Sequence, residues 1–396
     1  MPAQTESLIK LLNGTSSGRG KANVKIPSFR YRRTATEANY RFRINSVQAA
    51  STIAAAGQTI RVALPAFSAI VGEQYLKVSL AACSSGTYDP FTGASLIKSV
   101  RLRHSDVAYE VLNVKAVWAY LISKCRNKED KEQRKKIFGN PAAAAAAQEL
   151  VIPLLQPWSV HFGQEMYNPE PVRHGRRSTL FPAYALRENA VWEIEFEPIA
   201  NVCSTGAAGM QINEVSLCWE ELVASPDVVA AIKKKLPKAV CAPDFTFQPV
   251  TATGSEQSVD VTALLSRAPT HSIAFYLKTS ANDDPFDIVD VLSLEELECD
   301  GRILITNRDE TAAERQYVDI LEGRPSNRGA PEMPVISFDN DGGYTAPGHS
   351  SMQLSNTACN SVQIKFTAAA SSGQIIACHQ RHFLIDAGTI KNQNVY

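Results

Sequence analysis

Apolar and polar residues alternate along several short segments in the first half of the chain. The clearest segments are 60–64, 76–80, 100–103 and 192–197, the last of which begins WEIEF. A period of two places one set of side chains on a core and the other in solvent, as in the strands of antiparallel sheets. Segment 148–156, with its apolar centre LVIPLL, and segment 210–222 predict further strands. This half therefore indicates a β-sandwich.

The second half of the chain repeats the same pattern. Its strand candidates are 259–262, 273–277, 302–306, 317–321, 335–338, 362–366 and 374–385. Turn-rich stretches separate them, among them TSANDDP, EGRPSNRGAP and DNDGGYTAPG. Each half thus holds seven or eight short strands, which fits the eight-stranded jelly roll. The predicted fold class is all-β, with two tandem eight-stranded jelly-roll sandwiches.

Helical periodicity interrupts the first half. Between residues 114 and 138 the apolar residues recur at three-and-four spacing, at Val114, Val117, Trp118, Leu121, Ile122 and Cys125. The second part of this segment, KCRNKEDKEQRKK, is charged on all sides, and a run of six alanines at 142–147 follows it. We expect one helix that docks by its first half and projects by its second, as an excursion from a sandwich edge.

A short helix is also predicted between the two halves, at 225–236. Ser225 stands at the capping position, Pro226 at the first helical position and three lysines in the last turn, before Pro237. The predicted organisation is a basic N-terminal arm at 1–39, a first jelly roll at 40–224 with a helical insertion at about 114–147, a connector helix and linker at 225–243, and a second jelly roll at 244–396.

Charge is unevenly distributed in a chain whose formal net charge is zero. Residues 1–43 carry nine lysines and arginines against Glu6 and Glu37, a net +7, so the remaining residues carry −7. Segment 5–13, TESLIKLLN, could form an amphipathic helix on a surface, and GTSSGRGKANVK after it is typical of a flexible tail. Such an arm could contact nucleic-acid phosphates or anionic lipid headgroups, or it could be a solvated tail. The candidate contact residues are Lys10, Arg19, Lys21, Lys25, Arg30, Arg32 and Arg33.

No catalytic motif accompanies these strands. The sequence contains no GxSxG, no HExxH, no Walker loop and no GxGxxG before a helix. His379 and His382 are the nearest histidines, and a spacing of three points them to opposite faces of a strand. The eight cysteines include no CxxC pair, so we expect buried free thiols in a reducing compartment. We predict no enzyme, no cofactor and no metal site.

Acidic clusters offer the remaining candidates for chemistry. Asp283 with Asp284, and the segment DNDGG at 339–343, contain oxygen ligands of the kind that calcium prefers, but neither matches a calcium loop and both are typical of turns. Glu295, Glu296 and Glu298, followed by Asp300–Gly301, predict a solvated strand edge and a tight turn. There is no apolar run long enough to span a membrane and no secretory signal, so we expect a chain that folds in the cytosol.

The order of these segments resembles that of the double-jelly-roll major capsid proteins of icosahedral double-stranded DNA viruses, the hexon-like lineage. The resemblance covers roughly residues 40–390. It rests on an early strand ending near Ser46, the strand pair 96–104 and 107–112, a long excursion, strand 150–158, the stretch STLFPAYAL before 191–198, and a connector followed by a second sandwich. It implies a structural protein of the virion that forms a pseudo-hexagonal homotrimer. The implied partners are neighbouring capsomers, minor capsid proteins and an internal membrane reached through the arm, with no small-molecule substrate.

A β-sandwich protein that binds or processes glycans is the alternative. It would present exposed tryptophans on a concave face and an acid pair at catalytic distance. Of the four tryptophans, 118, 158, 192 and 219, three lie in patterns typical of a core and none lies beside an acid pair in the second half. The exposure of these four side chains distinguishes the two hypotheses.

Overall fold

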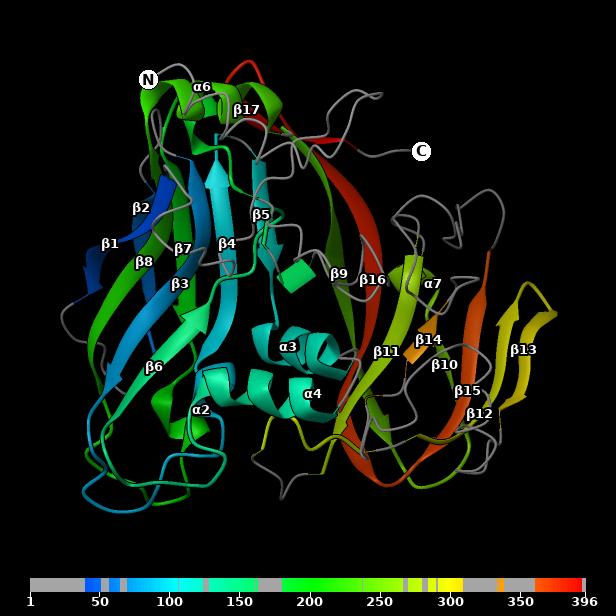
Figure 1. The fold of residues 1–396 in the computed structure, drawn as a ribbon. Coiled ribbons are helices and arrows are strands. Elements are labelled where there is room, and N and C mark those ends of the chain that lie inside the picture. Colours follow the sequence, from blue (N-terminus) through cyan, green and yellow to red (C-terminus); the bar gives the residue numbers. More distant parts are fainter. Residues whose placement is uncertain are drawn as a thin grey trace.

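The computed structural model describes residues 40–50, 57–64, 70–105, 107–123, 128–159, 161–162, 180–236, 238–265, 270–279, 284–289, 291–308, 333, 335–337 and 360–393. Within these ranges the chain forms two β-sandwiches that lie side by side, with two helices between their lower halves (Figure 1). The predicted strand 317–321, the acidic turn 339–343 and the N-terminal arm lie outside the described residues.

The first sandwich consists of eight strands in two four-stranded antiparallel sheets. The sheet orders are β1-β8-β3-β6 and β2-β7-β4-β5. The strands are β1 (Tyr40–Ala50), β2 (Thr59–Leu64), β3 (Val71–Leu80), β4 (Ile97–His104), β5 (Val107–Val111), β6 (Gln148–Pro153), β7 (Ala190–Phe196) and β8 (Ile212–Ala224). Buried residues alternate strictly with exposed ones in β2 and with partly buried ones in β7, which shows why these segments form strands of a sandwich. The crossing of successive strands between the two sheets is the jelly-roll topology.

The second sandwich repeats this strand order. One sheet has the order β9-β16-β11-β14, with β17 pairing the last part of β16, and the other has the order β10-β15-β12-β13. The strands are β9 (Ala239–Ala252), β10 (Gln257–Asp260), β11 (Thr270–Lys278), β12 (Val291–Cys299), β13 (Arg302–Arg308), β14 (Val335–Ser337), β15 (Val362–Ala368), β16 (Ser371–Asp386) and β17 (Thr389–Gln393). The predicted fold class, two jelly rolls in tandem, is confirmed.

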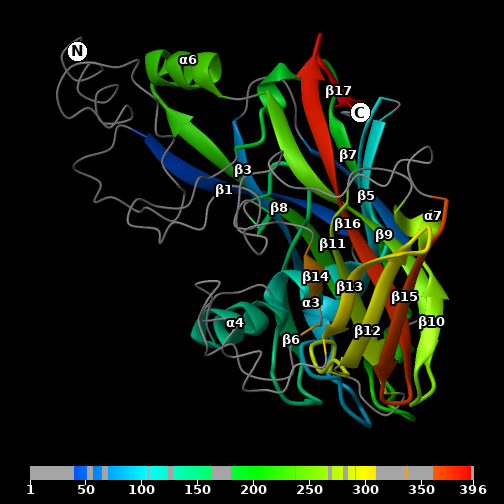
Figure 2. The same ribbon diagram turned by 90° about the vertical axis from the view of Figure 1, so that its right-hand side faces the viewer.

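The connector between the sandwiches is helix α6 (Pro226–Lys235), at the end of β8 and next to the start of β1 (Figure 2). It packs through Ile232 and Leu236 against Leu222. Ser225 has extended backbone at the helix start, but its side chain makes no capping hydrogen bond. The linker after the helix was expected to reach residue 243. It ends earlier, because β9 starts at Ala239 and pairs with β16 from that residue on.

The helical excursion differs from the sequence prediction. Instead of one helix with a projecting half, it contains α3 (Val114–Ser123), α4 (Lys128–Lys135) and the 3₁₀ turn η1 (Lys136–Phe138). The chain returns to the core directly after the charged part, where Phe138 is fully buried and its ring lies 4.9 Å from that of Trp118. An aromatic side chain at the end of the charged segment thus returns the chain to the core. The alanine run then pairs with the chain near Tyr88, whose N–H donates to the carbonyl of Ala144.

Short helical turns complete the two sandwiches. They are α2 (Thr92–Ser95), η2 (Ala183–Ala185), η3 (Ile199–Val202) and α7 (Thr262–Leu265). The stretch STLFPAYAL contacts β3 through Phe181. The N–H and C=O of Phe181 form hydrogen bonds with the C=O and N–H of Val71. The predicted turn at Asp300–Gly301 joins β12 to β13, with positive φ values at both residues.

The cysteines only partly follow the expectation of free thiols. Cys83, Cys203, Cys218 and Cys378 are free, and all but Cys83 are buried. Cys299, however, is disulfide-bonded. The expectation was wrong at Cys299 because a disulfide joins cysteines that are close in space, which their spacing along the chain does not reveal.

We predict that Trp192→Phe lowers the free energy of unfolding by about 2–3 kcal/mol. Trp192 is fully buried between the two sheets of the first sandwich, and its indole N–H donates to Oε1 of Gln74 at 2.7 Å. Phenylalanine leaves a cavity and an unpaired amide oxygen. Guanidinium unfolding measures the change, with Ile303→Ala on the exposed face of β13 as the control, expected to change stability by less than about 0.5 kcal/mol. Equal losses in the two variants would contradict the prediction.

Candidate functional site at the seam between the sandwiches

The two sandwiches meet along one face of the sheet β9-β16-β11, and we call this contact the seam. Helix α3 lies in the seam and is buried on nearly all sides. Its Tyr120 hydroxyl is 2.7 Å from Oγ of Ser272 on β11, and its ring lies 5.7 Å from that of Phe245 on β9. The apolar core of the first sandwich therefore continues through α3 into residues of the second, such as Phe245 and Ile376.

Tyr109 on β5 joins the sandwiches a second time. Its ring contacts that of Phe383 on β16, with centroids 5.4 Å apart, and its hydroxyl donates to the carbonyl of Pro243 at 2.9 Å. Burial, and then the nearby charge of Asp244, raises the pKa of Tyr109 well above its usual value. Asp244 is itself paired with Nε of Arg381 at 2.9 Å. The Tyr109 hydroxyl and the Asp244 carboxylate thus find their partners within the seam, as burial away from water requires.

The hairpin β16–β17 makes a third contact. The N–H of Arg187 donates to the carbonyl of Gly388 at 2.9 Å, and the N–H of Ile390 donates to Nδ1 of His104 at 3.4 Å. Gly388 has φ +83° and lies so close to Arg187 that a Cβ atom would meet the Cγ of that side chain at 2.2 Å. Burial lowers the pKa of His104. The C-terminal end of the described chain is therefore held by the first sandwich.

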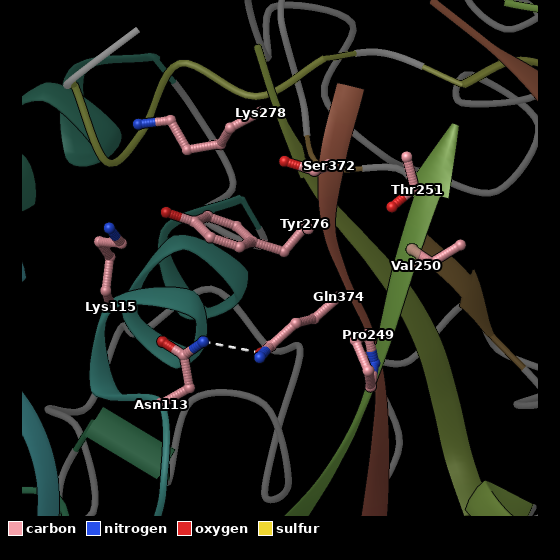
Figure 3. Close-up of a pocket in the computed structure, with 10 residues that line it drawn as sticks. Asn113, Lys115, Pro249, Val250, Thr251, Tyr276, Lys278, Ser372 and Gln374 are labelled. Carbon is pink, nitrogen blue, oxygen red and sulfur yellow. Dashed lines mark hydrogen bonds between the residues drawn. The ribbon is translucent and has the colours of Figure 1, made fainter. Parts of the chain in front are cut away.

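Beyond the start of α3 the seam opens into a groove of about 550 Å³ (Figure 3). Asn113 begins the helix by accepting the N–H of Ala116 on its Oδ1, and its Nδ2 donates to Oε1 of Gln374 at 2.7 Å. The groove is lined by Asn113, Lys115, Pro249, Val250, Thr251, Tyr276, Lys278, Ser372, Gly373 and Gln374. Unlike the three contacts described above, this part of the seam is open to solvent.

The structure does not place the basic residues that were predicted from sequence to contact a membrane or nucleic acid. Lys10, Arg19, Lys21, Lys25, Arg30, Arg32 and Arg33 all lie outside the described residues. Their contact with membrane or nucleic acid stays a prediction.

His379 and Asp300, both singled out in the sequence, have structural partners. His379 is buried, with Nε2 2.7 Å from Oγ1 of Thr246 and Nδ1 3.2 Å from Oγ1 of Thr270. Asp300 accepts the backbone N–H groups of Asn360 and Ser361, which lie just before β15. Within the described ranges no group of His, Cys, Asp and Glu is placed to hold a metal ion.

The residues of the seam were missed by sequence reasoning. Tyr109, Tyr120 and Ser272 fall in ordinary strand or helix patterns, and nothing in their spacing marks them. One signal was available in the segment VKAVWAYLIS, which is apolar on more than one face and so indicates a helix covered on several sides.

All four tryptophans are buried, with at most 6% of any of them exposed. A carbohydrate-binding face built on exposed tryptophans is therefore absent from the chain. No helix in the part of the chain that the structure describes is long and apolar enough to cross a membrane.

Comparison with known proteins gives a fold but no sequence family. No protein-family model and no curated protein sequence matches the chain. The structure is similar to the PBCV-1 virus capsid model, with a TM-score of 0.64 and 12% identity over 92% of this chain and 98% of that chain. It is also similar to the Faustovirus major capsid protein, with a TM-score of 0.59 and 11% identity over 97% and 98% of the two chains. The mavirus major capsid protein aligns over 96% and 97%, with a TM-score of 0.50 and 9% identity. At these identities the likeness shows a shared fold, the double jelly roll.

We predict that Phe245→Ala lowers the free energy of unfolding by about 3–5 kcal/mol, because it removes a ring from the middle of the seam. Phe247→Ala is the matched control, since Phe247 lies two residues further along β9 and is only partly buried. We expect a clearly smaller loss there. Guanidinium unfolding measures both variants, and a loss for Phe247→Ala as large as that for Phe245→Ala would argue against a seam centred on Phe245.

We also predict that the free energy of unfolding falls at acidic pH because of His104. A lowered pKa means that the unfolded chain takes up a proton, near pH 6.5, before the folded chain does. The stability due to neutral His104 is thus complete above that pH and is lost as pH falls through the folded pKa. His104→Gln, which does not titrate, should flatten the dependence of unfolding free energy on pH below about 6.5. An unchanged slope in the variant would show that His104 is not responsible.

Proposed function

We propose that this chain is a structural major capsid protein, which self-assembles as a pseudo-hexagonal trimer to form the shell of an icosahedral double-stranded DNA virus. The observation that supports this best is the presence of two complete jelly rolls in one chain. They have the same strand order in the same succession, and the fold matches capsid proteins over nearly their whole length.

The seam gives this proposal a physical basis. Three chains with two sandwiches each would present six sandwiches around one three-fold axis, and an outline close to a hexagon follows if the two sandwiches of a chain keep a fixed angle. The buried helix α3, the Tyr109 hydrogen bond and the β16–β17 hairpin hold the sandwiches together at three places. Contacts between subunits would then come from large buried areas of sandwich edges and loops rather than from a single site.

The helical excursion supplies only part of the surface available for such contacts. Helix α3 is buried in the seam, so only the part of the excursion after it is a candidate. Exposed apolar side chains lie elsewhere, at Ile44 on edge strand β1 and Ile303 on edge strand β13. Neighbouring capsomers and minor capsid proteins are the proposed partners, and the virion shell is the proposed location.

The arm at 1–39 is proposed to lie on the inner side of the shell, through its seven basic candidate residues. Its ligand would be anionic, either lipid headgroups of an internal membrane or nucleic-acid phosphates. The domain units proposed for assembly are the first jelly roll at 40–224 and the second at 244–396, with β9 extending the second back to Ala239.

A structural rather than catalytic role is part of this proposal. The glycan-binding alternative loses its main support because Trp158 and the other three tryptophans are buried. Glu296, one of the paired acids, forms an ion pair with Lys365 on the neighbouring strand of its sheet, as expected of a strand surface.

We predict that the purified chain sediments as a trimer, and that deletion of residues 1–35 leaves the trimer intact but impairs shell assembly or membrane association. The deletion ends before β1, so every strand that the structure describes remains in the variant. Sedimentation velocity measures the trimer, and negative-stain microscopy of the same sample should show a six-sided outline. A chain that stays monomeric at high concentration would overturn the proposal, and loss of the trimer on truncation would overturn the role given to the arm.

A further inference from the structure

The two sandwiches are built from equivalent strands in the same order. The sheet β1-β8-β3-β6 of the first corresponds strand by strand to β9-β16-β11-β14 of the second, and β2-β7-β4-β5 corresponds to β10-β15-β12-β13. The seam joins parts that are not equivalent, because edge strand β5 and helix α3 of the first sandwich lie against the sheet β9-β16-β11 of the second. Two surfaces therefore have a counterpart in the seam. The outer face of β1-β8-β3-β6 corresponds to the buried face of β9-β16-β11, and edge strand β13 corresponds to β5.

The strand pairing identifies the residues on the outer face of β1-β8-β3-β6. One row of paired residues crosses the four strands and shares a face: Gln48, Ser216, Lys77 and Val151. Lys77 stands between Leu76 and Val78, which belong to the core of the first sandwich, so the row points away from that core. Ile44 lies four residues before Gln48 in a regular part of β1 and is therefore on the same face.

The corresponding face of the second sandwich is closed by the first sandwich. Its row of Phe245, Cys378 and Ser272 crosses β9, β16 and β11, and each of these residues is 5% exposed or less. Phe245 and Cys378 belong to the apolar core that continues from the first sandwich, and Ser272 is hydrogen-bonded to α3. On the outer face of the first sandwich, by contrast, Ile44 is 60% exposed and Val151 is 44% exposed. The same face of the same fold is thus covered in one sandwich and open in the other.

The exposed apolar side chains of the described residues gather on these two surfaces. Five large apolar side chains are at least 40% exposed: Ile44, Val47, Leu112, Val151 and Ile303. Two of them lie on β1, one on β6 and one on β13, so four of the five belong to the open sheet or to the edge strand. Lys77, the cation of the outer row, lies 3.4 Å from a carboxylate oxygen of Glu149, so its charge keeps a partner when the face is covered. Both surfaces thus suit a contact that excludes water.

We propose that the outer face of sheet β1-β8-β3-β6 binds the second sandwich of another copy of this chain, which docks through its edge strand β13. This inference rests on the proposed function, since it names the surfaces that would join the chains of the trimer. The contact repeats between chains the arrangement that the seam makes within one chain. Strands β1 and β13 lie at opposite sides of the molecule (Figure 1), so each chain offers an open face at one side and an edge at the other. Such head-to-tail contacts close into a ring, and six sandwiches complete that ring in the proposed trimer.

A photo-cross-linking experiment identifies the partner surface directly. In the full chain, the photoreactive amino acid benzoylphenylalanine replaces Gln48, which is exposed on the outer face and contributes no apolar contact. Labelled and unlabelled chains are mixed, the trimer is isolated and irradiated, and mass spectrometry distinguishes cross-links between copies from those within one copy. We expect cross-links from position 48 to the second sandwich of another copy, around β13. The same amino acid in place of Leu112, which lies on neither surface, should not cross-link to that strand.

Three matched variants measure the contribution of each surface. Val151→Arg and Ile303→Arg each place a charge in the proposed contact, and Leu112→Arg places the same charge at an exposed apolar position outside it. Sedimentation velocity should show that the first two need at least about tenfold more protein for half-assembly, and that Leu112→Arg changes this concentration by less than about twofold. All three positions are exposed in the single chain, so the denaturation midpoint of the isolated chain should stay unchanged. An equal mixture of Val151→Arg and Ile303→Arg should form a dimer, because the intact edge of one variant fits the intact face of the other.

Several outcomes would overturn the proposal. A trimer in which position 48 does not cross-link to the second sandwich of another copy would show that the open face is not the docking surface. Equal losses of assembly in Leu112→Arg and the other two variants would have the same meaning, as would a mixture that associates no further than either variant alone. In each of these results a trimer of the unaltered chain still forms, so the proposed function stands while its assigned surfaces are wrong. An unaltered chain that stays monomeric at every concentration would instead overturn the proposed function and this inference together.

Discussion

The insertion of helix α3 between the two sandwiches is the constraint on which the rest of the structure depends. A helix that is buried on almost every side must have neighbours of two origins, and α3 takes them from the first sandwich and from the sheet β9-β16-β11. Its tyrosine hydroxyl can be buried only with a partner, and Ser272 of the second sandwich provides it. Neither sandwich alone can therefore complete the surroundings of this helix.

This constraint accounts for both the closed and the open parts of the seam. Where α3 covers the sheet, its face carries Phe245 and Ile376, which are nearly or fully buried. Where α3 has not yet begun, the same face carries threonine, serine and lysine, and the groove appears. A single sheet face thus changes from apolar to polar along its strands at the point where its cover ends.

The strands could be predicted from the sequence because their burial depends on a local period of two. β2 and β7 alternate as their residues predict, and the turn at Asp300–Gly301 follows from its residue types. The excursion could not be predicted in the same way, because the return of Phe138 to Trp118 is a contact between helical segments that their charges do not indicate. The groove was missed for a similar reason, since its lysines are brought together by strand pairing and helix docking, with a long stretch of sequence between them.

The contacts of the seam lead us to expect that the two sandwiches behave as one rigid body. Interfaces between domains of one chain are often small and polar, and such domains move relative to each other. Here the apolar core of the first sandwich includes side chains of the second, and the hairpin after β16 returns to contact His104 and Arg187. A hinge motion would have to expose Tyr109 and Phe383 together and leave the carbonyl of Pro243 without its donor. The same contacts that bury the helix thus fix the angle between the sandwiches, as the proposed trimer would require.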